Sequence, residues 1–107
     1  MTSNTRLLAR RVVIGGCGRT GSVLADALCE SGSLVQVLDI VPSAFDRLSP
    51  SLISSGRAQP RLADITLTSS LRISRAQDAD VFISVTGSDS INVTAAQIAH
   101  HILRVPK

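Results

Sequence analysis

Brief apolar runs alternate along the chain with stretches that repeat apolar residues at helical spacing. Four of the runs predict strands: residues 12–14, 34–39, 61–63 and 80–85. Four stretches between and after them predict helices: residues 22–31, 42–52, 67–76 and 89–103. Because strands that alternate with helices pair in parallel through right-handed crossovers, this order predicts an α/β fold with strand order 3-2-1-4. We expect a doubly wound parallel sheet in three α/β/α layers.

Two of the predicted helices carry apolar stripes. In the first helix, which is expected to end at Gly32, the stripe has four members: Val23, Leu24, Ala27 and Leu28. In the last helix, which Asp89 is expected to cap, the stripe also has four: Ile91, Ala95, Ile98 and Ile102. Pro50 interrupts the second helix or places its end near Leu48, and residues 49–60, rich in Ser, Pro and Gly, predict a loop.

A glycine-rich motif joins the first strand to the first helix. It reads Gly16-Cys17-Gly18-Arg19-Thr20-Gly21, and Asp39 ends the second strand 21 residues after Gly18. In a Rossmann-like unit the first glycine makes a tight turn, the second admits a pyrophosphate and the third packs helix on strand. The helix N-terminus attracts the phosphates, and a carboxylate at the position of Asp39 accepts hydrogen bonds from ribose hydroxyls. The motif therefore predicts a dinucleotide site, with NAD(H) favoured because Asp39 repels a 2′-phosphate.

Length and charge limit the remaining choices. The chain has 107 residues, 44% of them hydrophobic, which fits one domain over residues 11–107. Residues 1–10 are expected to form a flexible basic flank, and the lack of aromatic residues around its arginines argues against nucleic-acid binding. No apolar run approaches the length of a membrane span and no signal peptide is visible, so we expect a cytoplasmic protein without membrane insertion. No fifth strand is predicted after the last helix; it is absent or incomplete, as in a small natural domain or a part of a longer one.

The reactive side chains do not form an obvious catalytic set. Cys17 and Cys29 belong to no metal-binding or disulfide pattern. Cys17 is either a small residue that fits the loop or a redox-sensitive thiol whose pKa the helix N-terminus lowers. The chain has no tyrosine, and its single lysine is Lys107, which excludes a Tyr-x-x-x-Lys dehydrogenase site. A binding and regulatory module is thus favoured over an enzyme; the alternatives are a cofactor-binding fragment of an NAD-dependent oxidoreductase and an orphan nucleotide-binding domain.

Four motifs together resemble a known family. Besides the glycine motif and Leu38-Asp39, they are Ala63-Asp64-Ile65-Thr66 and the segment from Val85-Thr86-Gly87 to Asn92. In order and spacing they are similar to the TrkA-N domain, also called the RCK or KTN domain, of regulators of potassium channels and transporters. The resemblance covers roughly residues 11–103.

The resemblance implies a nucleotide-responsive domain that controls potassium transport. Its ligand would be NAD or NADH, with ATP, ADP or AMP as further candidates. Its partner would be the membrane subunit of a potassium channel or transporter, which would hold the protein at the inner membrane. Homodimers or larger rings are expected, with the last helix as a contact surface.

The same resemblance implies a role for each site residue. The implied binding residues are Gly16, Cys17, Gly18, Arg19, Thr20, Gly21, Asp39, Ile40, Asp64, Ile65, Thr86, Gly87 and Asn92, with Thr66 beside Asp64 at the adenine pocket. Plainer interpretations stay open: Asp64 and Thr86 as turn residues, and Arg19 and Asn92 as solvent-facing side chains. Ala63 and Ile65 replace a glycine and an alanine of the family pattern, which would tighten or shift the adenine pocket. Ile40 and Val41 stand where the family often has a polar residue, which removes a contact to ribose or phosphate.

Overall fold

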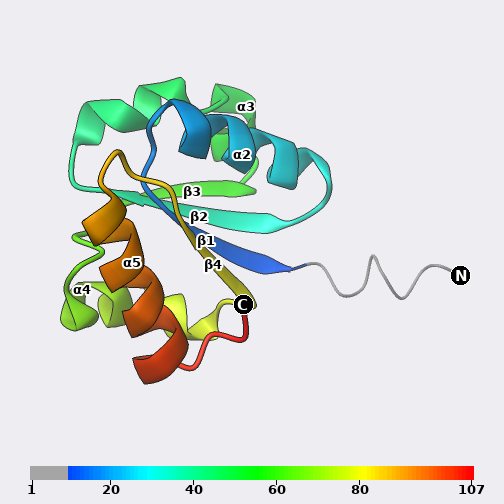
Figure 1. Ribbon diagram of the computed structural model, residues 1–107. Helices are drawn as coiled ribbons and strands as arrows, with labels where there is room; N and C mark the ends of the chain where they lie inside the picture. The colour runs from blue at the N-terminus through cyan, green and yellow to red at the C-terminus, as the bar shows by residue number, and fades with distance from the viewer. Residues whose placement is uncertain (1–9) are drawn as a thin grey trace, which may run out of the picture.

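The computed structural model describes residues 10–107, and in these the four strands form one parallel sheet. The strands are β1 (Arg11–Gly15), β2 (Leu34–Asp39), β3 (Ala58–Leu62) and β4 (Val81–Ser84). Their order across the sheet is β3-β2-β1-β4 (Figure 1). The Rossmann-like α/β fold and the strand order are thereby confirmed. Of the expected basic flank, only Arg10 lies within the described residues.

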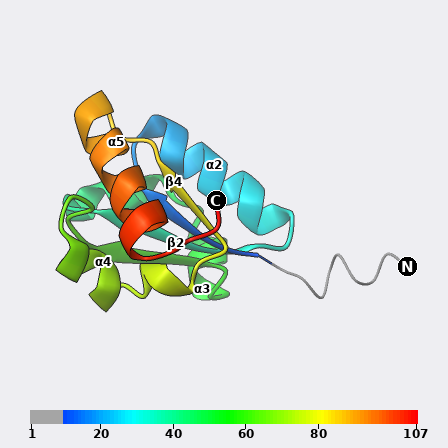
Figure 2. The same cartoon turned by 60° about the horizontal axis from the view of Figure 1, so that its bottom comes forward.

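Helices cover both faces of the sheet, which gives the three expected layers (Figures 1 and 2). One face carries α2 (Arg19–Glu30), a 3-10 helix (Pro42–Arg47) and α3 (Pro50–Ser54). The other face carries α4 (Thr68–Ile73), a 3-10 helix (Ala76–Asp78) and α5 (Asp89–Gln97), which continues as a π-helix (Ile98–Ile102). Each face has its own apolar core, because successive strand residues point to opposite sides.

The third strand begins earlier than the sequence predicts. It spans Ala58–Leu62, so the expected loop over residues 49–60 instead contains α3 and the first three residues of β3. Pro60 is accepted because β3 is an edge strand. Backbone groups of successive strand residues point to opposite sides. The carbonyl of Arg57 and the N–H of Ala63, each three residues from Pro60, bond to β2, so the nitrogen of Pro60 points to the open side. Pro50 is the first residue of α3, a position where proline is favoured, and the preceding segment forms a separate 3-10 helix.

The helices bury stripes that differ in part from those predicted; of the stripe predicted for the last helix, Ala95 is buried and Ile98 packs against the core. In α2 the buried residues are Gly21, Ser22, Ala25 and Cys29, whereas Val23 is 66% exposed. Leu24 and Leu28 pack only at the margin of the core. Small side chains face the sheet because α2 lies very close to the loop that precedes it. In the last helix the buried positions are Ala95, Ala99 and Leu103, and Ile91 and Ile102 of the predicted stripe are exposed.

The outer edge of β4 meets the last residues described. The N–H of Phe82 donates to the carbonyl of Lys107 at 2.7 Å, and Val105 is buried against the same core. Residues 10–107 thus contain four strands. On the edge of β4 that faces away from β1, they form a single backbone hydrogen bond. No helix within this part of the chain is long and apolar enough to cross a membrane.

Candidate functional site

The glycine motif forms a turn that only glycine fits at two positions. Gly16 has a φ of +112° and donates its N–H to the carbonyl of Leu38 at 2.7 Å, which ties the loop to β2. A Cβ on Gly21 would lie 2.0 Å from the carbonyl oxygen of Gly16. Gly21 therefore permits the first turn of α2 to rest on the loop, as the sequence predicts for the third glycine.

Gly18 differs from both, because a Cβ added there would meet no atom within 4 Å. It is the N-cap of α2, where no described side chain caps the helix and no acidic residue stands in the first turn. The first helical bond runs from the N–H of Ser22 to the carbonyl of Gly18. The earlier N–H groups of the helix are thus left for an anion, and the space over Gly18 is open to it.

Asp39 ends β2 beside this loop. Its Oδ2 accepts the N–H of Cys17 at 2.8 Å, and its Oδ1 accepts the N–H of Val41 at 2.9 Å. The carboxylate thus fixes the glycine loop and the turn after β2 at once. Each of its oxygens keeps a second lone pair for another donor, such as a hydroxyl group.

The segment after β3 is held by a short turn. The hydroxyl of Thr66 donates to Oδ1 of Asp64 at 2.6 Å, and its backbone N–H donates to the same oxygen at 2.9 Å. These hydrogen bonds from Thr66 hold the pKa of Asp64 below its ordinary value, because they favour the charged carboxylate. The turn buries the side chain of Ile65 against Gly15. Asp64 is therefore a turn-forming residue whose position also borders the cleft.

Asn92 closes the loop after β4 onto α5. Its Oδ1 accepts both the N–H and the hydroxyl of Thr86, at 2.8 and 2.6 Å, and its amide donates to the carbonyl of Thr86 at 3.1 Å. The helix begins at Asp89 as predicted, but its cap is Ser88, whose hydroxyl accepts the N–H of Ile91. Asp89 is the first helical residue, not the cap. Asn92 is a bonded, partly buried residue and does not face solvent.

These segments enclose a cleft of about 250 Å³ at the carboxyl ends of the strands. Eight predicted site residues line it: Gly16, Gly18, Asp39, Ile40, Asp64, Ile65, Thr86 and Gly87. The cleft does not reach the other five: Cys17, Arg19, Thr20, Gly21 and Asn92. Gly21 and Asn92 support its walls from behind, and Arg19 and Thr20 are exposed at the start of α2. The roles of all thirteen in binding stay predictions.

Four further residues line the cleft without having been predicted as contacts: Leu38, Ala63, Val85 and Ile91. Thr66, expected beside the adenine pocket, also lines it. Leu38, Ala63 and Val85 stand next to predicted strand ends, so their position along the chain was a usable signal. Ile91 carried none, because it was assigned to the buried stripe of the last helix; it is 37% exposed and faces the cleft.

The thiol of Cys17 does not have the lowered pKa that a redox role would need. Its side chain is fully buried under α2. Burial first, and then the carboxylate of Asp39, raise its pKa from 9.0 to about 11. This favours the interpretation of Cys17 as a small residue that fits the loop. Across residues 10–107, no group of three or more His, Cys, Asp or Glu side chains is placed to hold a metal ion.

Comparison with known proteins gives a consistent family match. The profile of the TrkA-N domain matches residues 12–107. The "Trk system potassium uptake protein TrkA" of Streptomyces coelicolor is 38% identical over 95 residues, which cover 88% of this chain and 40% of that protein. Proteins with the same name from Halomonas elongata and Haemophilus influenzae are 28% and 25% identical over 100 residues, covering 90% of this chain and 20% of theirs. The chain thus spans less than half the length of these relatives.

Proposed function

The chain belongs to the TrkA-N domain family, and from that premise we propose that it is a nucleotide-binding regulatory domain of a potassium uptake system. One observation carries the proposal. At the carboxyl edge of the sheet, the open backbone at Gly18, the uncapped start of α2 and the carboxylate of Asp39 meet around one cleft. Open parallel sheets bind nucleotides at this place.

The cleft suits the adenosine part of the ligand. Its volume of about 250 Å³ lies below the range of about 300–1,000 Å³ for whole small-molecule sites. Ile40, Ile65 and Ile91 give it apolar walls for a base, while Asp39 stands where ribose hydroxyls can donate to it. The rest of a dinucleotide would extend along the glycine loop to the helix N-terminus.

The charge of the cleft favours NAD or NADH, or AMP, ADP or ATP, over NADP(H). Asp39 and Asp64 both line it, and no lysine or arginine is among the lining residues of the described chain. A 2′-phosphate would meet two carboxylates and no cation. We therefore expect NADPH to bind more weakly than NADH.

The connection of the cleft to α5 supports a regulatory role. Thr86 borders the ligand space and is bonded to Asn92 on α5, so a ligand that moves the loop after β4 also acts on that helix. A ligand that binds one arrangement better shifts the population toward it. The membrane subunit of a potassium transporter would respond to this shift. It would contact the domain directly or through a homodimer or ring of this domain. The domain would then work in the cytoplasm, at the inner membrane through its partner, without catalysis of its own.

Calorimetric titration with NADH, NAD, ATP, ADP and AMP tests the proposal. We expect saturable binding of at least one of them, and an Asp39→Ala variant should bind it about tenfold more weakly, through lost charge-assisted hydrogen bonds. Asp46→Ala is the matched control, because Asp46 is an exposed acid on the following 3-10 helix outside the cleft. Asp39→Asn keeps an oxygen that can accept the N–H of Cys17. It therefore separates the effect of the lost charge from the effect of a disordered glycine loop. Absence of binding by all five nucleotides at millimolar concentration would contradict the proposal.

A further inference from the structure

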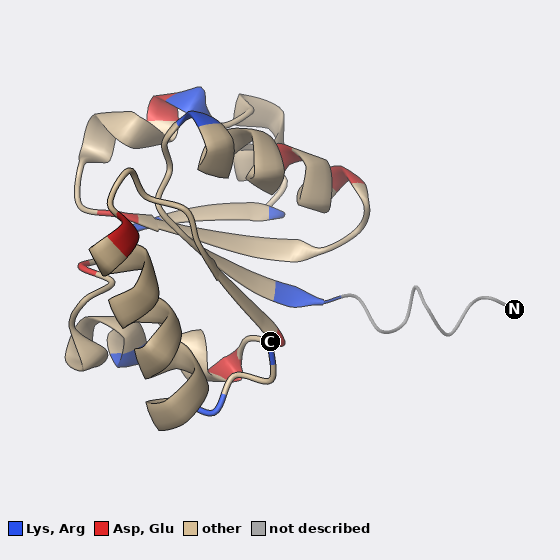
Figure 3. Ribbon diagram, viewed as in Figure 1, with Lys and Arg blue, Asp and Glu red and all other residues tan. Residues whose placement is uncertain are grey.

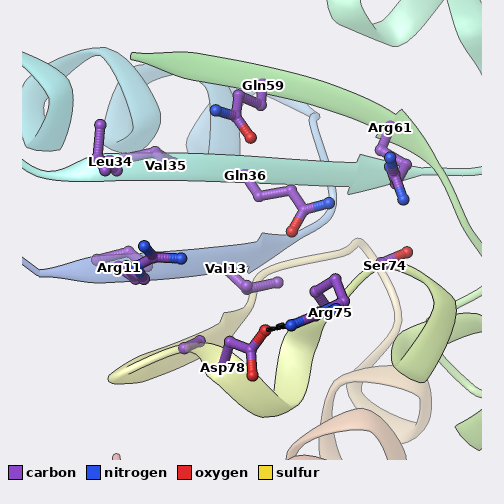
Figure 4. Close-up of a pocket in the computed structure, with 12 residues that line it drawn as sticks. Arg11, Val13, Leu34, Val35, Gln36, Gln59, Arg61, Ser74, Arg75 and Asp78 are labelled. Carbon is purple, nitrogen blue, oxygen red and sulfur yellow. Dashed lines mark hydrogen bonds and ion pairs between the residues drawn. The ribbon is translucent and has the colours of Figure 1, made fainter. Parts of the chain in front are cut away.

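A second hollow lies on the sheet face that carries α4 and α5, away from the glycine loop. Its volume is about 410 Å³, within the range of small-molecule sites. β1, β2 and β3 form its floor, and the segment after α4 forms one wall (Figure 4). Only strand residues and this wall line it, and none of them belongs to the nucleotide cleft.

The hollow exists because the helix layer stops halfway along the sheet. α4 ends at Ile73 after six residues, and Arg75 then adopts a left-handed conformation with a φ of +65°. This conformation is unfavourable for a residue with a side chain. It turns the chain into the 3-10 helix Ala76–Asp78 and brings the guanidinium of Arg75 to the carboxylate of Asp78 at 2.7 Å.

The floor of the hollow is polar where such a sheet is normally apolar. Gln36 interrupts the apolar run of β2, and Gln59 of β3 lies directly opposite it in the register. On the other face of the same strands, the corresponding row is Val12, Val35 and Ala58, all buried. The charged residues of the four strands are Arg11, Asp39 and Arg61, which stand at or next to strand ends. Figure 3 shows the strands otherwise uncharged.

Positive charge surrounds these amides. Three guanidinium groups line the hollow, those of Arg11, Arg61 and Arg75, against the single carboxylate of Asp78. Arg61 is held in place by donating from Nη1 to the carbonyl of Ile73 at 3.1 Å, at the end of α4. Its side chain extends from β3 toward Gln36 and the Arg75–Asp78 pair (Figure 4). Among the described residues, no carboxylate pairs with Arg61, so most of its donors stay available.

We infer that this hollow is a binding site for a small organic anion, distinct from the nucleotide cleft. A carboxylate or phosphate group of the ligand would bind the guanidinium of Arg61, and its other polar atoms would bond the amides of Gln36 and Gln59. β2 runs from the hollow to the cleft, and α4 connects Thr66 at the cleft to Ser74 at the hollow, so such an anion would act as a second input to the domain.

Nuclear magnetic resonance of the ¹⁵N-labelled full chain tests this site directly. Citrate and inorganic phosphate are titrated separately at neutral pH and constant ionic strength. We expect saturable shifts of the side-chain amide signals of Gln36 and Gln59, whereas binding at the glycine loop would move the backbone signal of Gly18 instead. Saturation by only one probe identifies the carboxylate or the phosphate as the group recognised.

Two variants and one control complete the experiment. Arg61→Gln should weaken binding about tenfold by removing a charge-assisted contact, and Gln36→Leu about fivefold while preserving the apolar pattern of β2. Arg72→Gln removes the same charge from an exposed position on α4 outside the hollow and should leave the affinity within about twofold. Equal affinities of the Arg61 and Arg72 variants, or no saturable shift at Gln36 and Gln59 with either probe, would overturn the inference. Without added anion, the affinity for NADH should be the same in the wild type and in the Arg61, Gln36 and Arg72 variants.

Discussion

The two halves of the cleft are built in different ways. The half formed by the β1–α2 loop and the end of β2 presents backbone N–H groups, an open glycine and a carboxylate with spare lone pairs. In the half formed after β3 and β4, the polar side chains form hydrogen bonds with one another, as between Thr66 and Asp64 and between Thr86 and Asn92. In the first half, Gly18 and Asp39 are therefore free to contact a ligand. The motif residues of the second half mainly shape the wall that it meets.

Within the first half, substitution of two glycines should separate folding from binding. In Gly21→Ala the new Cβ would lie 2.0 Å from the backbone oxygen of Gly16, so α2 must move away from the loop. We expect a loss of roughly 3 kcal/mol in the free energy of unfolding, seen as a large drop in melting temperature. This is the largest effect that we predict.

Gly18→Ala is the counterpart, because its Cβ meets no protein atom and its φ of −82° suits alanine. Its melting temperature should stay close to that of the wild type. Its affinity for NADH should fall about tenfold or more, because the new Cβ would occupy the space proposed for the pyrophosphate. Thermal unfolding and calorimetry on both variants measure the contrast. Similar stability of the two, or full affinity in Gly18→Ala, would remove the distinction between these glycines.

In the second half, Asn92→Ala should act first on stability. The substitution removes three hydrogen bonds and leaves the N–H and carbonyl of Thr86 without their partner, at a cost of about 2 kcal/mol. Nucleotide affinity should fall together with the order of the loop after β4. Thr94→Ala, on an exposed position of α5, is the control and should change stability by less than about 0.5 kcal/mol. An Asn92→Ala protein as stable as the control would show that this bond set does not hold the wall.

The smallest predicted effect concerns the turn after β3 and its dependence on pH. The pKa of Asp64 is below its ordinary value of 3.8 in the folded chain, so its carboxylate stabilises the fold above that value, and this contribution is lost as pH falls through the lower, folded-state pKa. Thr66→Val removes the side-chain hydrogen bond. It should cost less than about 1 kcal/mol at neutral pH, because the turn is partly exposed, and should raise the pKa of Asp64 toward 3.8.

Denaturant unfolding at neutral and strongly acidic pH, with a resonance titration of the Asp64 carboxyl group, measures both quantities. Thr68→Val, on the first turn of α4, is the control. An unchanged pKa in Thr66→Val would mean that the hydroxyl of Thr66 does not set the charge of this turn.

Much of the fold could be predicted because it depends on local patterns. Apolar runs and helical spacing gave the strand order, and the first two strands and the glycine loop came out at their predicted positions. The errors fall where packing overrides pattern. β3 includes Pro60 because an edge strand has an unused side, and α2 buries Ala25 and Cys29 rather than Val23 because it lies close to the loop.

For the candidate site, the sequence predicted positions better than roles. Strand ends converge at one edge of a parallel sheet, so Asp39, Asp64 and Thr86 were expected together, and all three line the cleft. Whether a side chain at such a place faces the ligand space or bonds to its own chain depends on rotamers and neighbours. Asn92, which was expected to contact the ligand, bonds to Thr86 and does not line the cleft. Ile91, which was expected in the core, lines the cleft.

The sequence by itself thus determined the order of the sheet and the glycine positions, because these follow from periodicity and from backbone conformations that glycine favours, and its four motifs carried the resemblance to the family. Only the tertiary structure decided which polar groups remain available. Cys17 and Asn92 lost their exposure to packing, and the hollow beside Arg61 and Gln36 opened because α4 ends early. Such outcomes depend on side-chain rotamers and three-dimensional packing, between distant segments for Cys17 and within one loop for Asn92, and periodicity does not encode them.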